Sequence, residues 1–171
     1  MKTKLSLAAA ALTLILPGAV LSEPLRVQAS APGAASCLAT SRGENEAAAR
    51  VTSQQRAAAN LPPVRANARL AQAAAKHACD MARRGVMAHQ GSRTQGPAQR
   101  VKGVGYRPTV TAENIAAGPF DLGQVLTAWS RSSGHAQNIM LPPVADFGIG
   151  RAVGSDGKTV FWAAVYAAPR G

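Results

Sequence analysis

The 171-residue sequence is poor in the large, rigid side chains from which protein cores are usually built. Aromatic residues make up only 4% of the chain, and all of them lie between Tyr106 and Tyr166. Alanine supplies much of the 47% hydrophobic content, so helices form easily but the bulky part of the core must come from the C-terminal half. This apolar content excludes a disordered polycation, and the length predicts one domain.

Acidic residues are also scarce. The 8 Asp and Glu face 19 Lys and Arg, which gives a formal net charge of +11. The basic residues are scattered, no run exceeds Arg83-Arg84, and no aromatic residues alternate with them. The chain also lacks the motifs that dock in a nucleic-acid groove or stack bases, so we expect no nucleic-acid partner.

Local catalytic signatures are missing as well. The sequence contains no HExxH metal-binding helix, no GxSxG nucleophile elbow, and no phosphate-binding or dinucleotide-binding glycine motif. Any functional site must therefore be assembled by the fold from residues that are distant in the sequence.

The first 22 residues have the layout of a secretory signal peptide. A cationic start, residues 1–4, precedes an apolar run over residues 5–16, and cleavage is predicted after Ser22. An uncleaved N-terminal anchor is the alternative, although a membrane span needs about 20 apolar residues. Cleavage leaves 17 basic and 8 acidic side chains, a net charge of +9.

The predicted mature protein has no other segment of membrane length, so we expect it not to span a membrane. It should be exported, to the periplasm or the extracellular space. There the abundant polyanions are cell-wall polymers and lipid headgroups, and the basic charge predicts loose association with one of them.

Export also changes the expectation for Cys37 and Cys79, the only two cysteines. An oxidising compartment favours a disulfide between them, and two unpaired thiols are the alternative. Closing a loop of about 40 residues would stabilise the fold by about 3–4 kcal/mol in the chain-entropy account.

Hydrophobic periodicity and turn residues predict a small α+β domain over residues 44–171, preceded by an extended leader over residues 23–43. The Gly- and Pro-rich stretch at 87–111 is expected to be a loop. The remaining elements are three helices, two strands and their hairpin turn: helices at 44–60, 67–84 and 121–131, strands at 147–153 and 159–167, and the turn at 154–157.

The order and wording of several segments resemble the CAP superfamily, which comprises the cysteine-rich secretory, antigen 5 and pathogenesis-related proteins and is also called the SCP domain. The similarity, closest to the short bacterial branch, runs from about residue 45 to 168. The resemblance implies secretion and an α-β-α sandwich with a small antiparallel sheet between helix layers. It rests on the following segments: Asn60-Leu61-Pro62-Pro63-Val64, His77-Ala78-Cys79-Asp80-Met81-Ala82, His89, Arg100, Gly105-Tyr106, Glu113-Asn114-Ile115-Ala116-Ala117-Gly118, and the run from Trp129 to Met140.

The family resemblance implies a central cavity lined by two histidines and two acids, which in some members holds a divalent metal. His89 matches the first histidine, Glu113 the acid of the Glu-Asn motif, and His135 the histidine of the Gly-His step. Ser132 occupies the position of the second acid. Two imidazoles, one carboxylate and a water would suit Zn²⁺. Serine cannot take a proton at neutral pH, so this departure weakens a hydrolase more than a metal site.

Each of these residues also has a structural interpretation. His89 would cap the turn at 85–87, Glu113 would accept backbone N–H groups in a loop before the third helix, and His135 would orient the turn at the end of that helix. His77 lies on the apolar stripe of its helix and is interpreted as a core histidine. Asn114 and Trp129 are interpreted as architecture.

Three functions remain open. The favoured one is a secreted, non-catalytic binding module whose His/Glu cavity holds a divalent metal, such as zinc, or a small apolar, sterol-like ligand. The alternatives are a metal-dependent hydrolase acting on a cell-wall or peptide substrate and a structural envelope protein. The missing second acid disfavours the hydrolase, and the retained histidine pair disfavours the structural protein.

Overall fold

A computed structural model describes residues 26–171, so the predicted signal peptide lies outside the described residues. A mixed sheet with the path β2-β6-β7-β5 forms the centre, and a short fifth strand, β3, pairs with β6 in parallel. A separate pair, β1 and β4, is antiparallel. The strands are β1 (Arg26–Gln28), β2 (Ser36–Cys37), β3 (Arg65–Ala66), β4 (Val86–Ala88), β5 (Pro108–Gly118), β6 (Asp146–Val153) and β7 (Val160–Pro169).

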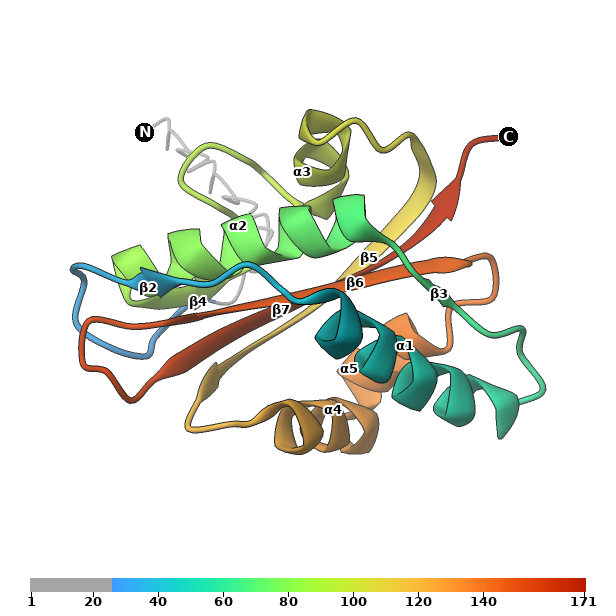
Figure 1. The fold of residues 1–171 in the computed structure, drawn as a ribbon, viewed down its shortest axis with the longest axis horizontal. Coiled ribbons are helices and arrows are strands. Elements are labelled where there is room, and N and C mark those ends of the chain that lie inside the picture. Colours follow the sequence, from blue (N-terminus) through green and yellow to red (C-terminus); the bar gives the residue numbers. More distant parts are fainter. Residues whose placement is uncertain (1–25) are drawn as a thin grey trace, which may run out of the picture.

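Helices cover both faces of this sheet (Figure 1). One face carries α2 and α3, and the other carries α1, α4 and α5. The predicted α-β-α sandwich is therefore confirmed, apart from the parallel pairing of β3. The helices are α1 (Arg42–Ala57), α2 (Ala68–Arg84), α3 (Pro97–Gly103), α4 (Leu122–Arg131) and α5 (Ser133–Ile139).

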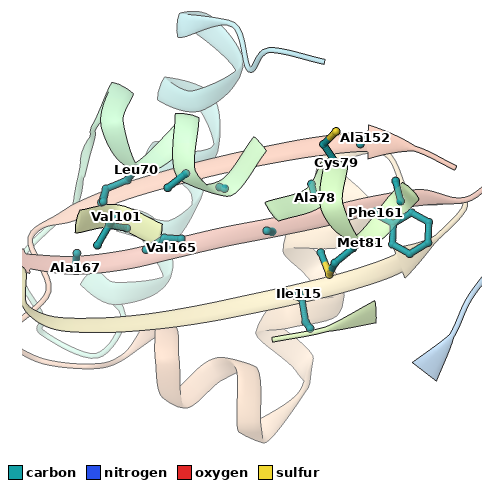
Figure 2. Close-up of a cluster of buried hydrophobic side chains, with 14 of the residues drawn as sticks. Leu70, Ala78, Cys79, Met81, Val101, Ile115, Ala152, Phe161, Val165 and Ala167 are labelled. Atoms are coloured by element: carbon teal, nitrogen blue, oxygen red, sulfur yellow. The ribbon is translucent and has the colours of Figure 1, made fainter. Parts of the chain in front are cut away.

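The central strand β7 builds both cores because alternate side chains of a strand point to opposite faces of a sheet. Phe161, Ala163 and Val165 pack under α2, in the cluster that Figure 2 shows. Trp162 and Tyr166 pack under α1, α4 and α5 on the other side. The late aromatics thus serve mainly one layer, while α2 meets the sheet mostly through alanines and Leu70.

Two glycines on β6 allow α2 to lie directly on the sheet. A Cβ at Gly148 would meet the backbone of Ala71 at 2.1 Å, and a Cβ at Gly150 would meet the backbone of Ala75 at 2.2 Å. Because backbone atoms cannot turn aside as a long side chain can, any larger residue would push the helix off the strand. The small side chains of α2 and the glycines of β6 together allow this close approach of helix and strand.

The ends of α2 follow from its sequence. The Asn67 side chain accepts hydrogen bonds from the N–H groups of Arg69 and Leu70, which satisfies two donors of the first turn. Gly85 ends the helix in the left-handed region, at φ 66°, where glycine is favoured. These signals placed the predicted helix at 67–84 within one residue of the observed one.

The disulfide is confirmed and joins the N-terminal segment to α2. Cys37 on β2 is bonded to Cys79, with Cα atoms 5.1 Å apart. The bond holds the segment before α1 beside the outer surface of α2, at the edge of the sheet where β2 pairs with β6. Among residues 26–171, no helix is long and apolar enough to cross a membrane.

The prediction of a loop over residues 87–111 is wrong. This stretch contains the end of β4, all of α3 and the start of β5. Short elements with glycine at their ends give no periodic signal, because they contain too few residues to show a period. The helix α3, for example, covers only seven residues. The first helix also begins earlier than expected, at Arg42, because the Ser41 side chain accepts the N–H of Glu44.

Candidate functional site

Glu113 lies in the middle of β5, and the expectation of a loop there is wrong. Its register partner is Val165, whose side chain belongs to the core under α2, so Glu113 points to the same layer. The next residue, Asn114, points to the opposite layer. The Glu-Asn step thus sends one polar side chain to each face of the sheet.

The carboxylate of Glu113 is almost fully enclosed, with 1% of the side chain exposed. Oε1 accepts a hydrogen bond from His89 Nδ1 at 2.9 Å, and Oε2 accepts one from Arg100 Nη2. The Nε2 atom of His77 lies 3.7 Å from Oε1. The partners of the Glu113 carboxylate are therefore three side chains: His89 just after β4, Arg100 on α3 and His77 on α2. They are not the backbone N–H groups of a turn.

The protonation of this cluster follows from its partners. Burial alone would raise the pKa of Glu113, but the hydrogen bond from His89 and the charge and hydrogen bond of Arg100 outweigh it and lower the pKa. Glu113 is thus ionised and neutralised by the buried Arg100 guanidinium. Arg100 also donates to the His89 carbonyl and to Thr94 Oγ1.

His77 is a buried neutral histidine. Burial lowers its pKa to about 4, and the nearby Arg100 adds to this, while Glu113 and Asp80 oppose it. Nε2 lies 3.0 Å from the Ala88 carbonyl, which can only accept, so Nε2 carries the proton. Nδ1 has no hydrogen-bond partner among the described residues.

We expect His77 to make the protein less stable in acid. The unfolded chain binds the proton near pH 6.5 and the folded chain only near pH 4, so stability falls as the pH drops through this interval. The loss should be about 3 kcal/mol, at 1.36 kcal/mol per pH unit. Urea unfolding at pH 7, 5.5 and 4 measures it.

His77→Gln keeps a donor for the Ala88 carbonyl but does not titrate, so it is the matched control. Most of the loss of stability that the wild type shows between pH 7 and pH 4 should be absent in this variant. An unchanged pH dependence in this variant would place the acid sensitivity elsewhere, for example at His135, whose pKa burial and the charge of His89 also lower.

His135 belongs to α5, a helix that the sequence did not predict. Its ring lies 6.4 Å from the Trp129 ring, and its Nδ1 is buried without a partner among the described residues. Its carbonyl accepts from Asn114, which also bonds to Tyr166 and Asn138. The structure records no bond between His135 and the Glu113 carboxylate, although His89 is near enough to affect the pKa of His135.

Ser132 joins α4 to α5. Its N–H donates to the Trp129 carbonyl and its own carbonyl accepts from Ala136, so its backbone closes one helix and opens the next. Its hydroxyl makes no side-chain cap bond. No hydrogen bond links Ser132 to His89, Glu113 or His135 among these described residues.

The sequence did not assign Arg100 or His77 to the site. Arg100 stood in a glycine-rich stretch interpreted as a loop, and no spacing relates it to Glu113. His77 carried one signal, an ionisable residue on the apolar stripe of a helix, which indicates that something on the opposing layer compensates it. That partner proved to be Glu113, together with the Ala88 carbonyl.

A metal held jointly by His89, Glu113 and His135 does not fit this arrangement. Both carboxylate oxygens of Glu113 already accept hydrogen bonds. In the part of the chain from residue 26 to 171, no three His, Cys, Asp or Glu side chains are placed to hold a metal ion. The imidazoles of His89 and His135 stay available for a ligand, and the His89 side chain is 49% exposed.

Comparison with known proteins places these residues in a wider context. The sequence model of CAP, described as the cysteine-rich secretory protein family, matches residues 49–166. YkwD of Bacillus subtilis (strain 168) is 29% identical over 100 residues, which are 58% of this chain and 39% of that protein. The chain thus spans about two fifths of the length of this relative.

Two solved bacterial structures share the fold. An extracellular SCP-domain protein of Bacillus anthracis is 23% identical, with a TM-score of 0.65 over 74% of this chain and 40% of its own. An outer surface protein of Borrelia burgdorferi is 18% identical, with a TM-score of 0.67 over 77% of this chain and 96% of its own. At these identities the likeness concerns the fold alone.

Proposed function

The chain belongs to the cysteine-rich secretory protein family, CAP, and from this premise we propose that it is an exported, non-catalytic binding module of the bacterial envelope. A hydrolase that used Glu113 as its base would need that carboxylate free to take a proton beside the substrate. Glu113 is ionised but enclosed, and both its oxygens are engaged by His89 and Arg100. This engagement is the observation that carries the proposal.

Export is supported by the layout of the first 22 residues and by the similarity to two bacterial proteins, one extracellular and one of the outer surface. The disulfide between Cys37 and Cys79 agrees with an oxidising compartment. A net charge of +9 after cleavage favours contact with the anionic polymers of an envelope.

The ligand-facing groups of this site are the imidazoles of His89 and His135. Glu113 holds His89 through Nδ1, which leaves Nε2 of that ring for a ligand. His135 lies beside the buried ring of Trp129. The two ring nitrogens are the polar groups that would orient a small, largely apolar ligand. For a divalent cation, Glu113 would orient His89 without being a ligand itself.

Zinc is the simplest probe of these two imidazoles. Calorimetric titration of the purified protein should give binding no tighter than micromolar, because two neutral nitrogens supply little charge. His89→Ala and His135→Ala should each abolish it. Glu113→Gln should weaken it by about tenfold to a hundredfold, the effect of losing a group that orients a ligand.

Purified cell-wall material should not be hydrolysed by the wild-type protein, with or without zinc. If zinc binds tightly and Glu113→Gln abolishes this binding, Glu113 is a zinc ligand. The hydrolase hypothesis would then be favoured. If both histidine substitutions leave zinc binding unchanged, the imidazole site is wrong and the structural alternative is favoured.

A further inference from the structure

The outward face of α2 carries a straight row of positive charge. Arg69, Lys76 and Arg83 are exposed and seven residues apart. Seven residues make almost two full turns, so the three side chains lie on one line along the helix, about 10.5 Å apart. Between them the exposed or half-buried positions are Gln72, Ala75 and Asp80, and the Asp80 carboxylate is paired with Arg84.

These three cations have no acidic partners. Among residues 26–171, none of them forms a salt bridge, and Arg69 has only the Gly105 carbonyl. The carboxylates nearby are each taken by another arginine: Glu46 by Arg42, Asp80 by Arg84 and Asp146 by Arg65. The row therefore presents uncompensated charge.

The same helix face forms the floor of an open groove of ≈ 1430 Å³. Residues 37–42, held by the disulfide, make one wall, and residues 92–94 with α3 make the other. Figure 1 shows α2 between the β2 segment and α3. Arg93 adds a further exposed cation at the rim.

The groove continues past the start of α2 into a second hollow. There Arg69 is joined by Arg65, Arg107 and Arg170 around the single carboxylate of Asp146. Ala66 lines both hollows. Exposed cations thus line both the groove and the hollow at the start of α2.

We propose that this groove over α2, which includes none of His89, Glu113 and His135, is a docking site for an extended, linear polyanion with repeating carboxylate or phosphate groups, such as a wall polymer. A row of charges at regular spacing complements a chain whose charges also recur. Arginine is well suited to carboxylate and phosphate oxygens because its guanidinium presents paired donors.

The composition of the groove disfavours a membrane as occupant. A helix that lies in a lipid surface needs bulky apolar residues, such as Trp, Phe or Leu, beside its cations. The outward face of α2 has alanine, glutamine and Asp80 between its cations, and Leu38 is the one exposed large hydrophobic residue among the described residues that line the groove.

Binding can be measured by calorimetry with two probes, oligogalacturonate and inorganic polyphosphate of matched length. The triple variant Arg69→Gln, Lys76→Gln, Arg83→Gln should weaken binding by about tenfold, which corresponds to three exposed charge pairs of ordinary strength. The control triple Arg50→Gln, Arg131→Gln, Lys158→Gln removes the same charge from exposed positions outside the groove. It should weaken binding less than about twofold.

Oligomer length gives an independent test. Affinity should rise with length until the oligomer spans about 21 Å, the distance along α2 from Arg69 to Arg83, and should rise further only for oligomers long enough to reach the cations of the second hollow. The tighter of the two probes identifies the source as a carboxylated or a phosphate-linked polymer. Equal loss in both triple variants, no dependence on length, or binding only to phosphatidylglycerol vesicles would overturn the proposal.

This inference rests on the proposed export, but not on the imidazole site. The His89→Ala, His135→Ala double variant should therefore bind either oligomer as the wild type does. Loss of oligomer binding in that double variant with no loss in the α2 triple would place the polyanion at the imidazoles and overturn the α2 groove.

Discussion

Replacing Arg56 by methionine is expected to lower the free energy of unfolding by about 3–5 kcal/mol, because it leaves several buried carbonyls without a donor. Arg56 is 0% exposed, at the C-terminal end of α1. Burial lowers the pKa of its guanidinium, which nevertheless stays charged at any pH at which the protein folds.

The Arg56 guanidinium satisfies five backbone carbonyls and no carboxylate. Nε donates to the Pro62 carbonyl at 2.8 Å, and Nη1 donates to Ile139 at 2.7 Å and Leu141 at 3.0 Å. Nη2 donates to two more, those of Pro142 and Val144. One side chain thus holds the end of α1 to the turn that leads from α5 into β6.

Arg50 on the same helix is exposed and forms no salt bridge among the described residues, so Arg50→Met is the matched control and should change stability by less than about 0.5 kcal/mol. Urea unfolding with the disulfide intact measures both variants. Similar small effects for the two would show that water or a rearranged turn replaces the guanidinium, contrary to the expectation.

The second large effect is expected at the buried ion pair. Glu113→Gln should cost about 3–5 kcal/mol, because it keeps the shape of the side chain but leaves the Arg100 charge, whose side chain is 6% exposed, without its counter-ion. Glu44→Gln is a control, since its pair with Arg151 is more exposed and should be worth less than about 1 kcal/mol.

A double-mutant cycle separates the pair from its surroundings. Removing both charges with Arg100→Met and Glu113→Leu should cost less than the sum of the single changes, because no unpaired charge is then buried. Additive effects would contradict a direct coupling between Arg100 and Glu113. The cycle also tests the assignment of Glu113 as neutralised, on which the absence of a free carboxylate base depends.

Most of the regular elements were predictable because their signals are local. The Asn67 cap and the Gly85 stop define α2, and the apolar pattern before and after residues 154–157 defines the last hairpin. The short elements α3, α5 and β4 were not predictable in this way. They cover three to seven residues each, too few for a period, and form because neighbouring layers hold them.

The site was only partly predictable. The motifs named His89 and Glu113, which the structure joins at 2.9 Å, but they gave no sign that Arg100 would take the other oxygen. The groove over α2 was not found either, although the spacing of Arg69, Lys76 and Arg83 can be read in the sequence. A row of charges on a helix lies in a groove only where other elements of the fold flank the helix, as residues 37–42 and α3 flank α2.

The scarcity of aromatic and acidic residues, the caps, the hairpin and the ordered motifs determined the fold class and the basic surface from the sequence alone, because each depends on neighbours along the chain. Tertiary structure decided which charges are neutralised and which are free. Arg56, Arg100 and Glu113 acquire partners from elements far away in the sequence, and the cations of α2 acquire none. Whether a charge is buried, paired or exposed depends on the layers packed around it, and neighbours along the chain do not show which side chains those layers bring together.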